Sequence, residues 1–346
     1  MHSNFFLKSF RILLFPLAIV YWLIILIRNK LYDKNIFEST TFGLPLICVG
    51  NLSVGGTGKS PMVEYLVKNL KDNFRIATLS RGYKRKTKGY ALADERSSAL
   101  QIGDEPMQFH LKFPDVPVAV GEERMVAIPQ LLHDKPGTQC IILDDAFQHR
   151  AVKAGLNILL TDYKNLFTRD FFLPTGDLRD LKASYKRAQI ILVTKCDSGM
   201  TQEQKKEITE EIRPVENQHI FFTANRYSHP YHILRQEEKM KLSSHMEVLL
   251  VTGIANPRPL KELLHDNTRT YYMMHFPDHH IFTIDDWKEI KKKFEAMEAK
   301  QKIILTTEKD AMRLVKFGQE MKDIPLYVIP IEHQFCSTKE KSFLIL

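Results

Sequence analysis

The chain has 346 residues, of which 44% are apolar and 26% are charged, with a formal net charge of +8. This length is typical of about two ordinary domains, and the composition is that of a globular protein, which excludes a disordered or fibrous chain. The four cysteines lie far apart and form no C-x-x-C pair, which argues against a disulfide scaffold or thiolate zinc site and favours a cytosolic compartment.

The first 36 residues combine an apolar run with half of the excess positive charge. Ile12–Ile27 is uncharged, and as a helix it would rise about 24 Å, less than the roughly 30 Å of a bilayer core. Because basic residues flank both ends, the positive-inside rule gives no orientation. The segment predicts a membrane anchor that either spans the bilayer or lies in one leaflet. A buried core helix and a cleaved signal peptide are the alternatives, and no small-residue cleavage site follows the run.

From Leu44 onward, short apolar runs alternate with helical stretches, the pattern of βαβ units and a mostly parallel sheet. The fold class predicted is a P-loop NTPase-like α/β domain with a second, smaller α/β domain and an N-terminal membrane helix. We expect the anchor at 1–36, the larger domain at 37–226 and the smaller domain at 227–346, with a polar linker at 227–244. The strands expected in the larger domain are Pro45–Val49, Arg75–Leu79, Val116–Val120, Cys140–Leu143, Asn157–Leu160, Gln189–Val193 and His219–Thr223. In the smaller domain we expect strands at Glu247–Val251, Thr270–His275, Lys302–Leu305 and Pro325–Ile329, and helices at 257–264 and 284–299.

A glycine-rich loop follows the first of these strands and leads into a helix. In such a P-loop, backbone N–H groups and the helix N-terminus bind phosphate, the lysine meets the β- and γ-phosphate oxygens, and the following serine can ligate Mg²⁺. Ser53 stands where the generic G-x-x-x-x-G-K-[ST] pattern has glycine, and a βα turn without a ligand is the alternative. The expected nucleotide-binding residues are Ser53, Val54, Gly55, Gly56, Thr57, Gly58, Lys59 and Ser60.

Two acidic residues end another apolar strand. Asp144 and Asp145 would lie at the carboxyl edge of the sheet, next to the phosphate loop, where Mg²⁺ is held. We expect the metal ligands to be Asp144 or Asp145 together with Ser60, although paired acids at a strand end can also cap a helix.

Other motifs leave the class of nucleotide-binding protein open. Thr194-Lys195-Cys196-Asp197 imitates the guanine-reading [NT]-K-x-D run of GTPases, so a membrane-anchored P-loop GTPase is the rival hypothesis. The basic run 81–88 predicts an anionic partner, either a sugar phosphate or lipid headgroups, with a solvated loop as the alternative. No nucleic-acid partner is expected, because no pattern of stacking aromatics accompanies this run.

The residues around these motifs point to a family more specifically than the motifs themselves do. The chain resembles the tetraacyldisaccharide 4′-kinases, the P-loop kinases that phosphorylate a lipid A precursor, from the N-terminal helix to about Asp310. The resemblance rests on seven signatures in order: VGN with GGTGKSP (49–61), SRGY (80–83), GDEP (103–106), DDAFQH (144–149), LP with GxLR (173–179), FPDHH (276–280) and TEKD (307–310). The family usually has glycine where Ala146 stands and glutamate where Asp180 stands.

The resemblance implies a reaction and a set of roles. The γ-phosphate of ATP, with Mg²⁺, passes to the 4′-hydroxyl of an acylated glucosamine disaccharide 1-phosphate, giving lipid IVA. Lys59 holds phosphate, and Asp104, supported by His279, takes the hydroxyl proton; without the resemblance, capping a helix would explain Asp104 equally well. Tyr83, Arg124 and His149 would line the substrate site. The expected location is the cytoplasmic face of the inner membrane, with the membrane surface and the lipid substrate as partners and no obligate protein partner.

Overall fold

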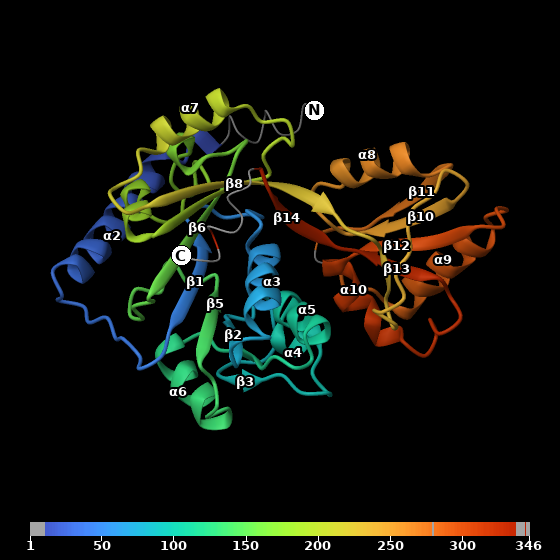
Figure 1. Cartoon of the computed structure of the whole chain (residues 1–346), viewed down its shortest axis with the longest axis horizontal. Coiled ribbons are helices and arrows are strands. Elements are labelled where there is room, and N and C mark those ends of the chain that lie inside the picture. Colours follow the sequence, from blue (N-terminus) through green and yellow to red (C-terminus); the bar gives the residue numbers. More distant parts are fainter. Residues whose placement is uncertain (1–10, 279, 337–342, 344–346) are drawn as a thin grey trace.

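The computed structural model describes residues 11–278, 280–336 and 343, and it contains two mostly parallel β-sheets joined by short connections (Figure 1). The first sheet has nine strands in the order β14-β8-β7-β6-β1-β5-β2-β4-β3, and the second has five in the order β11-β10-β12-β13-β9. The two sheets lie toward opposite ends of the long axis of the molecule, with α2 at the outer end of the first. The predicted fold class is confirmed by this arrangement and by the comparisons given below.

The first sheet is parallel except at its two edges, where β3 and β14 run antiparallel to their neighbours. Its central strand β1 lies between β5 and β6, with Val49 opposite Asp144 in the register with β5. The carboxyl ends of β1 and β5 therefore lie side by side. The strands are β1 (Leu46–Asn51), β2 (Ile76–Ser80), β3 (Ala91–Leu92), β4 (Val118–Val120), β5 (Cys140–Asp144), β6 (Leu156–Asp162), β7 (Ile190–Thr194), β8 (His219–Tyr227) and β14 (Ile331–Phe335).

Helices cover both faces of this sheet, so its strands are apolar on both sides, as parallel strands require. One face packs on α3 (Lys59–Leu70) and the aromatic side chains of α5 (Asp104–Lys112). The other packs on α6 (Arg124–Asp134) and α7 (Gln202–Ile212). The short helices α4 (Ala99–Ile102), η1 (Phe167–Arg169) and η2 (Lys182–Arg187) lie in the connections.

The second sheet has the same βα construction on a smaller scale. Its strands are β9 (Tyr231–His232), β10 (Glu247–Thr252), β11 (Thr270–His275), β12 (Lys302–Thr307) and β13 (Leu326–Ile329). Its helices are α8 (Arg258–Asn267), α9 (Ile284–Glu295), α10 (Glu308–Leu314) and η3 (Val315–Phe317). One apolar cluster contains Ile102, Met107 and Val120 of the first domain together with Met312 and Leu314 of the second, so the two parts share a core beside α5 and α10.

Three strands depart from the sequence expectation, and the first is the short edge strand β3 (Ala91–Leu92), which was not expected. The stretch 227–244, expected as a linker, contains β9, which pairs antiparallel with β13. After Pro330 the chain returns to the first sheet as β14, which pairs with β8 and was not expected. We keep the proposed division at residue 227, but sheet membership does not follow it, because β14 belongs to the first sheet.

The N-terminal helix α2 (Phe15–Asp33) is apolar over its first three turns and continues through a polar end that lay outside the predicted apolar run. It is the one described helix long and apolar enough to cross a membrane, by length and composition alone. Only Ala18 and Asn29 of the helix are buried. Most of its large apolar side chains are exposed, among them Leu17, Ile24 and Ile27 at 51–58%.

Candidate active site

The P-loop connects β1 to α3, with Lys59 as the first residue of the helix. Gly55 and Gly58 have φ values of 109° and 89°, which glycine adopts far more readily than residues with a side chain. Inside the loop, the Asn51 amide donates to Thr57 Oγ1 at 2.9 Å. The predicted loop residues 53–60 thus form one turn of chain at the start of α3, the geometry that suits a bound phosphate.

Two side chains hold the loop from the sheet. Thr194 Oγ1, at the end of β7, donates to the Thr57 carbonyl at 2.8 Å. His333 Nε2, on β14, lies 2.9 Å from the Gly58 carbonyl, and its Nδ1 lies 3.0 Å from Thr223 Oγ1. Because a peptide's carbonyl and N–H point to opposite sides, holding these carbonyls fixes the direction of the N–H groups of Gly58 and Lys59. Thr194 therefore supports the loop, a role that needs no guanine.

Asp144 and Asp145 have sharply different environments at the end of β5. Burial, and then the charge of Asp145, raises the pKa of Asp144 to about 7. Ser80 Oγ donates to Asp144 Oδ2 at 3.3 Å, while Oδ1 is buried with no hydrogen-bond partner. A buried carboxylate oxygen without a donor is the ligand that a bound cation would satisfy, so the site fits Mg²⁺.

Asp145 is instead surrounded by positive charge. Burial alone would raise its pKa, but Lys59 and Arg179 outweigh burial and lower the pKa to about 2. Lys59 Nζ lies 3.6 Å from Asp145 Oδ1, and both terminal nitrogens of Arg179 donate to the same carboxylate. Arg179 Nη2 also donates to Asn51 Oδ1 at 2.5 Å. The motif containing Arg179 was noted in the sequence, but its pairing with Asp145 was not predicted.

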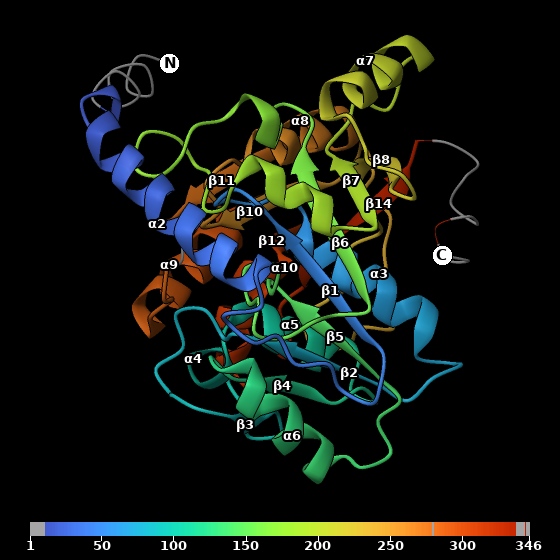
Figure 2. The ribbon, with the colours of Figure 1, turned by 90° about the vertical axis from the view of Figure 1, so that its left-hand side faces the viewer.

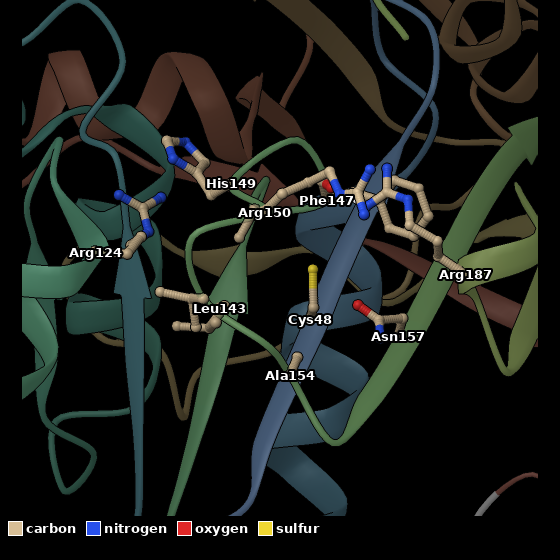
Figure 3. Close-up of a pocket in the computed structure, with 11 residues that line it drawn as sticks. Cys48, Arg124, Leu143, Phe147, His149, Arg150, Ala154, Asn157 and Arg187 are labelled. Atoms are coloured by element: carbon tan, nitrogen blue, oxygen red, sulfur yellow. Dashed lines mark hydrogen bonds between the residues drawn. The ribbon is translucent and has the colours of Figure 1, made fainter. Parts of the chain in front are cut away.

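Arg124 and His149 lie close together at one side of a small cavity (Figure 3). The Arg124 side chain is buried and donates to the carbonyls of Gly121 and Asp144. Burial, reinforced by Arg124, lowers the pKa of His149 to about 4. Both line a cavity of about 20 Å³, which is room for one water molecule rather than for a sugar. Tyr83 does not line this cavity and is 61% exposed. The substrate role of these three residues stays a prediction.

The predicted base Asp104 begins α5 and forms a two-pronged ion pair with Arg313 of α10. Arg313 Nη1 also donates to the His280 carbonyl at 3.4 Å, which joins the FPDHH segment to Asp104. His279 lies outside the described residues, so its predicted partnership with Asp104 stays a prediction. Glu105, the next residue, interacts electrostatically with Lys59, and burial raises its pKa. The α5 N-terminus therefore faces Lys59. Arg313 was missed, since the TEKD signature ends three residues before it.

A buried triad ties together the three helices that carry these groups. Lys112 Nζ, at the end of α5, lies 2.5 Å from Glu64 Oε2 of α3 and 2.5 Å from Glu308 Oε1 of α10. Burial, and then the charge of Glu64, raises the pKa of Glu308 to about 8. The starts of α3 and α5 carry Lys59 and Asp104, and the last turn of α10 carries Arg313, so this triad fixes their relative positions.

A family profile described as Tetraacyldisaccharide-1-P 4′-kinase matches residues 10–345. The chain belongs to the tetraacyldisaccharide 4′-kinase family. It is 46% identical over 333 residues to the Tetraacyldisaccharide 4′-kinase of Flavobacterium johnsoniae, covering 95% of this chain and 94% of that protein. It is 42% identical over 344 residues to the Tetraacyldisaccharide 4′-kinase of Bacteroides thetaiotaomicron, covering 95% of this chain and 90% of that protein. The crystal structure of Aquifex aeolicus LpxK in complex with ATP matches with a TM-score of 0.76 and 29% identity, covering 96% of this chain and 97% of that one.

These matches settle the class of enzyme. The predicted resemblance is confirmed, and the chain is a kinase of lipid A biosynthesis, a transferase that uses ATP. The rival prediction of a membrane-anchored GTPase is not favoured. The Thr194–Asp197 run that prompted it has other contacts here, because Thr194 supports the P-loop and Lys195 Nζ pairs with Asp162 Oδ2 at 2.7 Å.

Proposed function

We propose that this kinase transfers the γ-phosphate of ATP to the 4′-hydroxyl of a tetraacyldisaccharide 1-phosphate, with Asp104 as proton acceptor. The observation that carries the proposal is the convergence of three helices at one place. The α3 start supplies Lys59, the α5 start supplies Asp104, and α10 supplies Arg313, which grips Asp104. The Asp144–Asp145 pair lies at the neighbouring strand end.

The chain's own groups do the following work. The P-loop N–H groups and Lys59 bind the phosphates and neutralise the charge that spreads over the transferring group. Arg313 holds the Asp104 carboxylate so that it can receive the hydroxyl proton. A carboxylate paired with arginine is a weak base, and this is sufficient, because phosphoryl transfer through a loose transition state depends on positioning more than on base strength. His279 would orient Asp104 or the hydroxyl.

Mg²⁺ would be held by Asp144 and Ser60, with Asp145 beside them. Among the residues that the structure describes there is no cluster of three His, Cys, Asp or Glu side chains that could hold a metal. This fits Mg²⁺, which in nucleotide sites takes one or two protein carboxylates and completes its shell with phosphate oxygens and water. When bound, the ion would neutralise part of the charge on the phosphates.

The lipid substrate and the helix α2 together support a location at the cytoplasmic face of the inner membrane. ATP is a cytosolic substrate, the acylated acceptor is a membrane lipid, and α2 exposes apolar side chains around most of its circumference. The basic residues at both ends of the helix suit anionic headgroups. The membrane surface is therefore the expected partner of this face.

Two variants and their combination test the assignment of the base. Asp104→Ala and His279→Ala should each lower kcat far more than they raise the KM for ATP, measured with the tetraacyl substrate in detergent. If the two residues act as one unit, the double variant should be little slower than the slower single variant. Losses that multiply would show independent residues and would contradict a shared proton-accepting unit.

A further inference from the structure

The polar end of α2 is docked onto the loops that form the active site, not onto a remote surface. Asn29 is 3% exposed although the rest of the helix is largely open, and its Nδ2 donates to Asp180 Oδ1 at 2.7 Å and lies 3.3 Å from Ser184 Oγ. Asp180 is 1% exposed. A buried polar contact of this kind costs free energy when it is broken, because each partner is left unsatisfied away from water.

Asp180 is the centre of a fully buried hydrogen-bonding node. Its Oδ1 accepts from the Leu181 N–H at 2.8 Å and from Ser184 Oγ at 2.9 Å, in addition to Asn29. Its Oδ2 pairs with Arg187 Nη2 at 2.8 Å, and the Arg187 guanidinium lies 4.3 Å from the centre of the Phe147 ring. Phe147 belongs to the DDAFQH segment, so the node joins α2 to the loop that carries the acidic pair.

Other contacts from α2 reach the backbone of the 144–149 segment and of Arg179. Arg28 Nη2 donates to the Gln148 carbonyl at 2.7 Å, three residues after Asp145. Tyr21 Oη donates at 3.0 Å to the carbonyl of Arg179, the residue that grips the Asp145 carboxylate. Gln148 Nε2 in turn donates to the Asn51 carbonyl at 2.8 Å.

The segment just before α2 touches the loop that pairs with the P-loop. Arg11 Nη2 lies 2.9 Å from Asp177 Oδ1, and its Nε donates to the Pro174 carbonyl at 2.8 Å. The Asp177 carbonyl accepts the N–H of Val54, within the P-loop, at 2.8 Å. Figure 2 shows α2 on the side of the molecule that faces the viewer, running from the upper left toward β1.

We infer that α2 is a brace of the active site as well as a membrane-facing helix, and that Asn29 and Asp180 are positioning residues for phosphoryl transfer. The polar side chains of Tyr21, Arg28 and Asn29 hold the 144–149 and 174–180 segments in place. These segments carry Asp145 and Arg179, and Asp145 in turn positions Lys59. The apolar remainder of the helix is left for the lipid surface. The two roles therefore reside in different side chains of one helix and can be separated. The inference rests on the established kinase activity, not on the assignment of Asp104 as base.

The test uses the full-length protein and compares two parts of α2: Asn29, which contacts Asp180, and the exposed apolar residues Ile24 and Ile27. Asn29→Leu removes the hydrogen-bond donor to Asp180 and puts an apolar, helix-forming residue in its place. Binding to phosphatidylethanolamine–phosphatidylglycerol vesicles should therefore be unchanged. Its kcat on the tetraacyl substrate in detergent micelles, with both substrates saturating, should fall at least tenfold. The matched control is the double variant Ile24→Asn/Ile27→Asn, which changes two exposed apolar residues of α2. It should weaken vesicle binding and leave the micellar kcat within twofold of wild type.

A polarity exchange separates a positioning role from general loss of folding. Asn29→Asp places two carboxylates together and should lose activity. Adding Asp180→Asn reverses the direction of the hydrogen bond and should recover part of kcat, since the amide oxygen at position 180 can still accept from Arg187 although the Leu181 N–H loses its acceptor. Full micellar kcat in Asn29→Leu would overturn the inference. So would a kcat loss in the Ile24–Ile27 control as large as that in Asn29→Leu, or a polarity exchange that recovers nothing in a folded protein. If the wild-type protein consumed ATP without transferring phosphate to the lipid, that result would instead count against the proposed reaction.

Discussion

Replacing Lys112 by methionine is the sharpest test of how the three helices are held. The side chains of Glu64 and Glu308 are only 7% and 8% exposed, and Lys112 is the one cation that both contact among the described residues. In Lys112→Met, Glu64 keeps the Gln108 amide and Glu308 keeps the Ile331 N–H, but one oxygen of each carboxylate loses its donor. Breaking a buried ion pair from one side costs about 3–5 kcal/mol of unfolding free energy.

The sign of the pH dependence follows from the carboxylates. The pKa of Glu308 is already raised to about 8, and removing the lysine raises it further. A folded-state pKa above the unfolded value gives stability that is complete below the unfolded pKa and is lost as the pH rises through the folded one. The deficit of Lys112→Met should therefore be small near pH 5 and largest at pH 8 and above.

Urea denaturation at several pH values measures this deficit, with Lys71→Met as the matched control. Lys71 pairs with Asp115 at the surface, where Asp115 is 56% exposed, so its loss should cost less than about 1 kcal/mol at every pH. Adding Glu308→Gln to Lys112→Met should recover part of the deficit, since an amide can donate to Glu64. A deficit no larger than that of the control, or one that shrinks as the pH rises, would refute the reasoning. The kcat of Lys112→Met should also fall, because the triad positions Lys59 relative to Asp104.

Three further predictions concern single side chains. Lys59→Ala should lower kcat by about 10²–10³ with an unchanged circular dichroism spectrum, since charge stabilisation of the transferring group is a large term; near-normal turnover would refute the P-loop assignment. Arg313→Ala should lower kcat more than it changes the KM for ATP, and Arg313→Lys should restore only part, because an ammonium cannot form two parallel bonds to Asp104; equal activity of both variants would contradict this. His149 should stay neutral down to about pH 4 in an NMR titration, and because the unfolded chain binds a proton there already below 6.5, the protein should lose stability as the pH falls from 6.5 to 4; a midpoint near 6.5 would show that the ring is solvated.

The sequence located most strands and the P-loop because their signals are local. An apolar run such as Cys140–Leu143 carries its own evidence, and so does a glycine loop that ends in Lys59. Strand β14 carries little, because it is five residues long, follows β13 after a single proline and pairs with β8 about a hundred residues upstream. Its register, and with it the contact of His333 with Gly58, is decided by tertiary pairing.

The same difference explains what was missed in the site. The residue types of the acidic pair could be predicted, but their opposite pKa shifts could not. The lowered pKa of Asp145 depends on its contact with Arg179, and the raised pKa of Asp144 depends on its burial by neighbouring residues. Likewise, Arg313 and Asp104 are 209 positions apart, and no local pattern marks either as the other's partner. Asp180 drew notice only as a departure from the family pattern, and its role became visible with Asn29 placed beside it.

Transfer of labelled phosphate to the lipid tests the central claim most directly. The protein is incubated in detergent with tetraacyldisaccharide 1-phosphate and γ-labelled ATP or GTP, and the product is treated with mild acid, which removes the anomeric 1-phosphate. We predict that ATP labels the lipid, that the label survives the acid, and that GTP is a poor donor both in wild type and in Asp197→Asn. Label lost with the 1-phosphate, a preference for GTP, or nucleotide hydrolysis without labelled lipid would contradict the account.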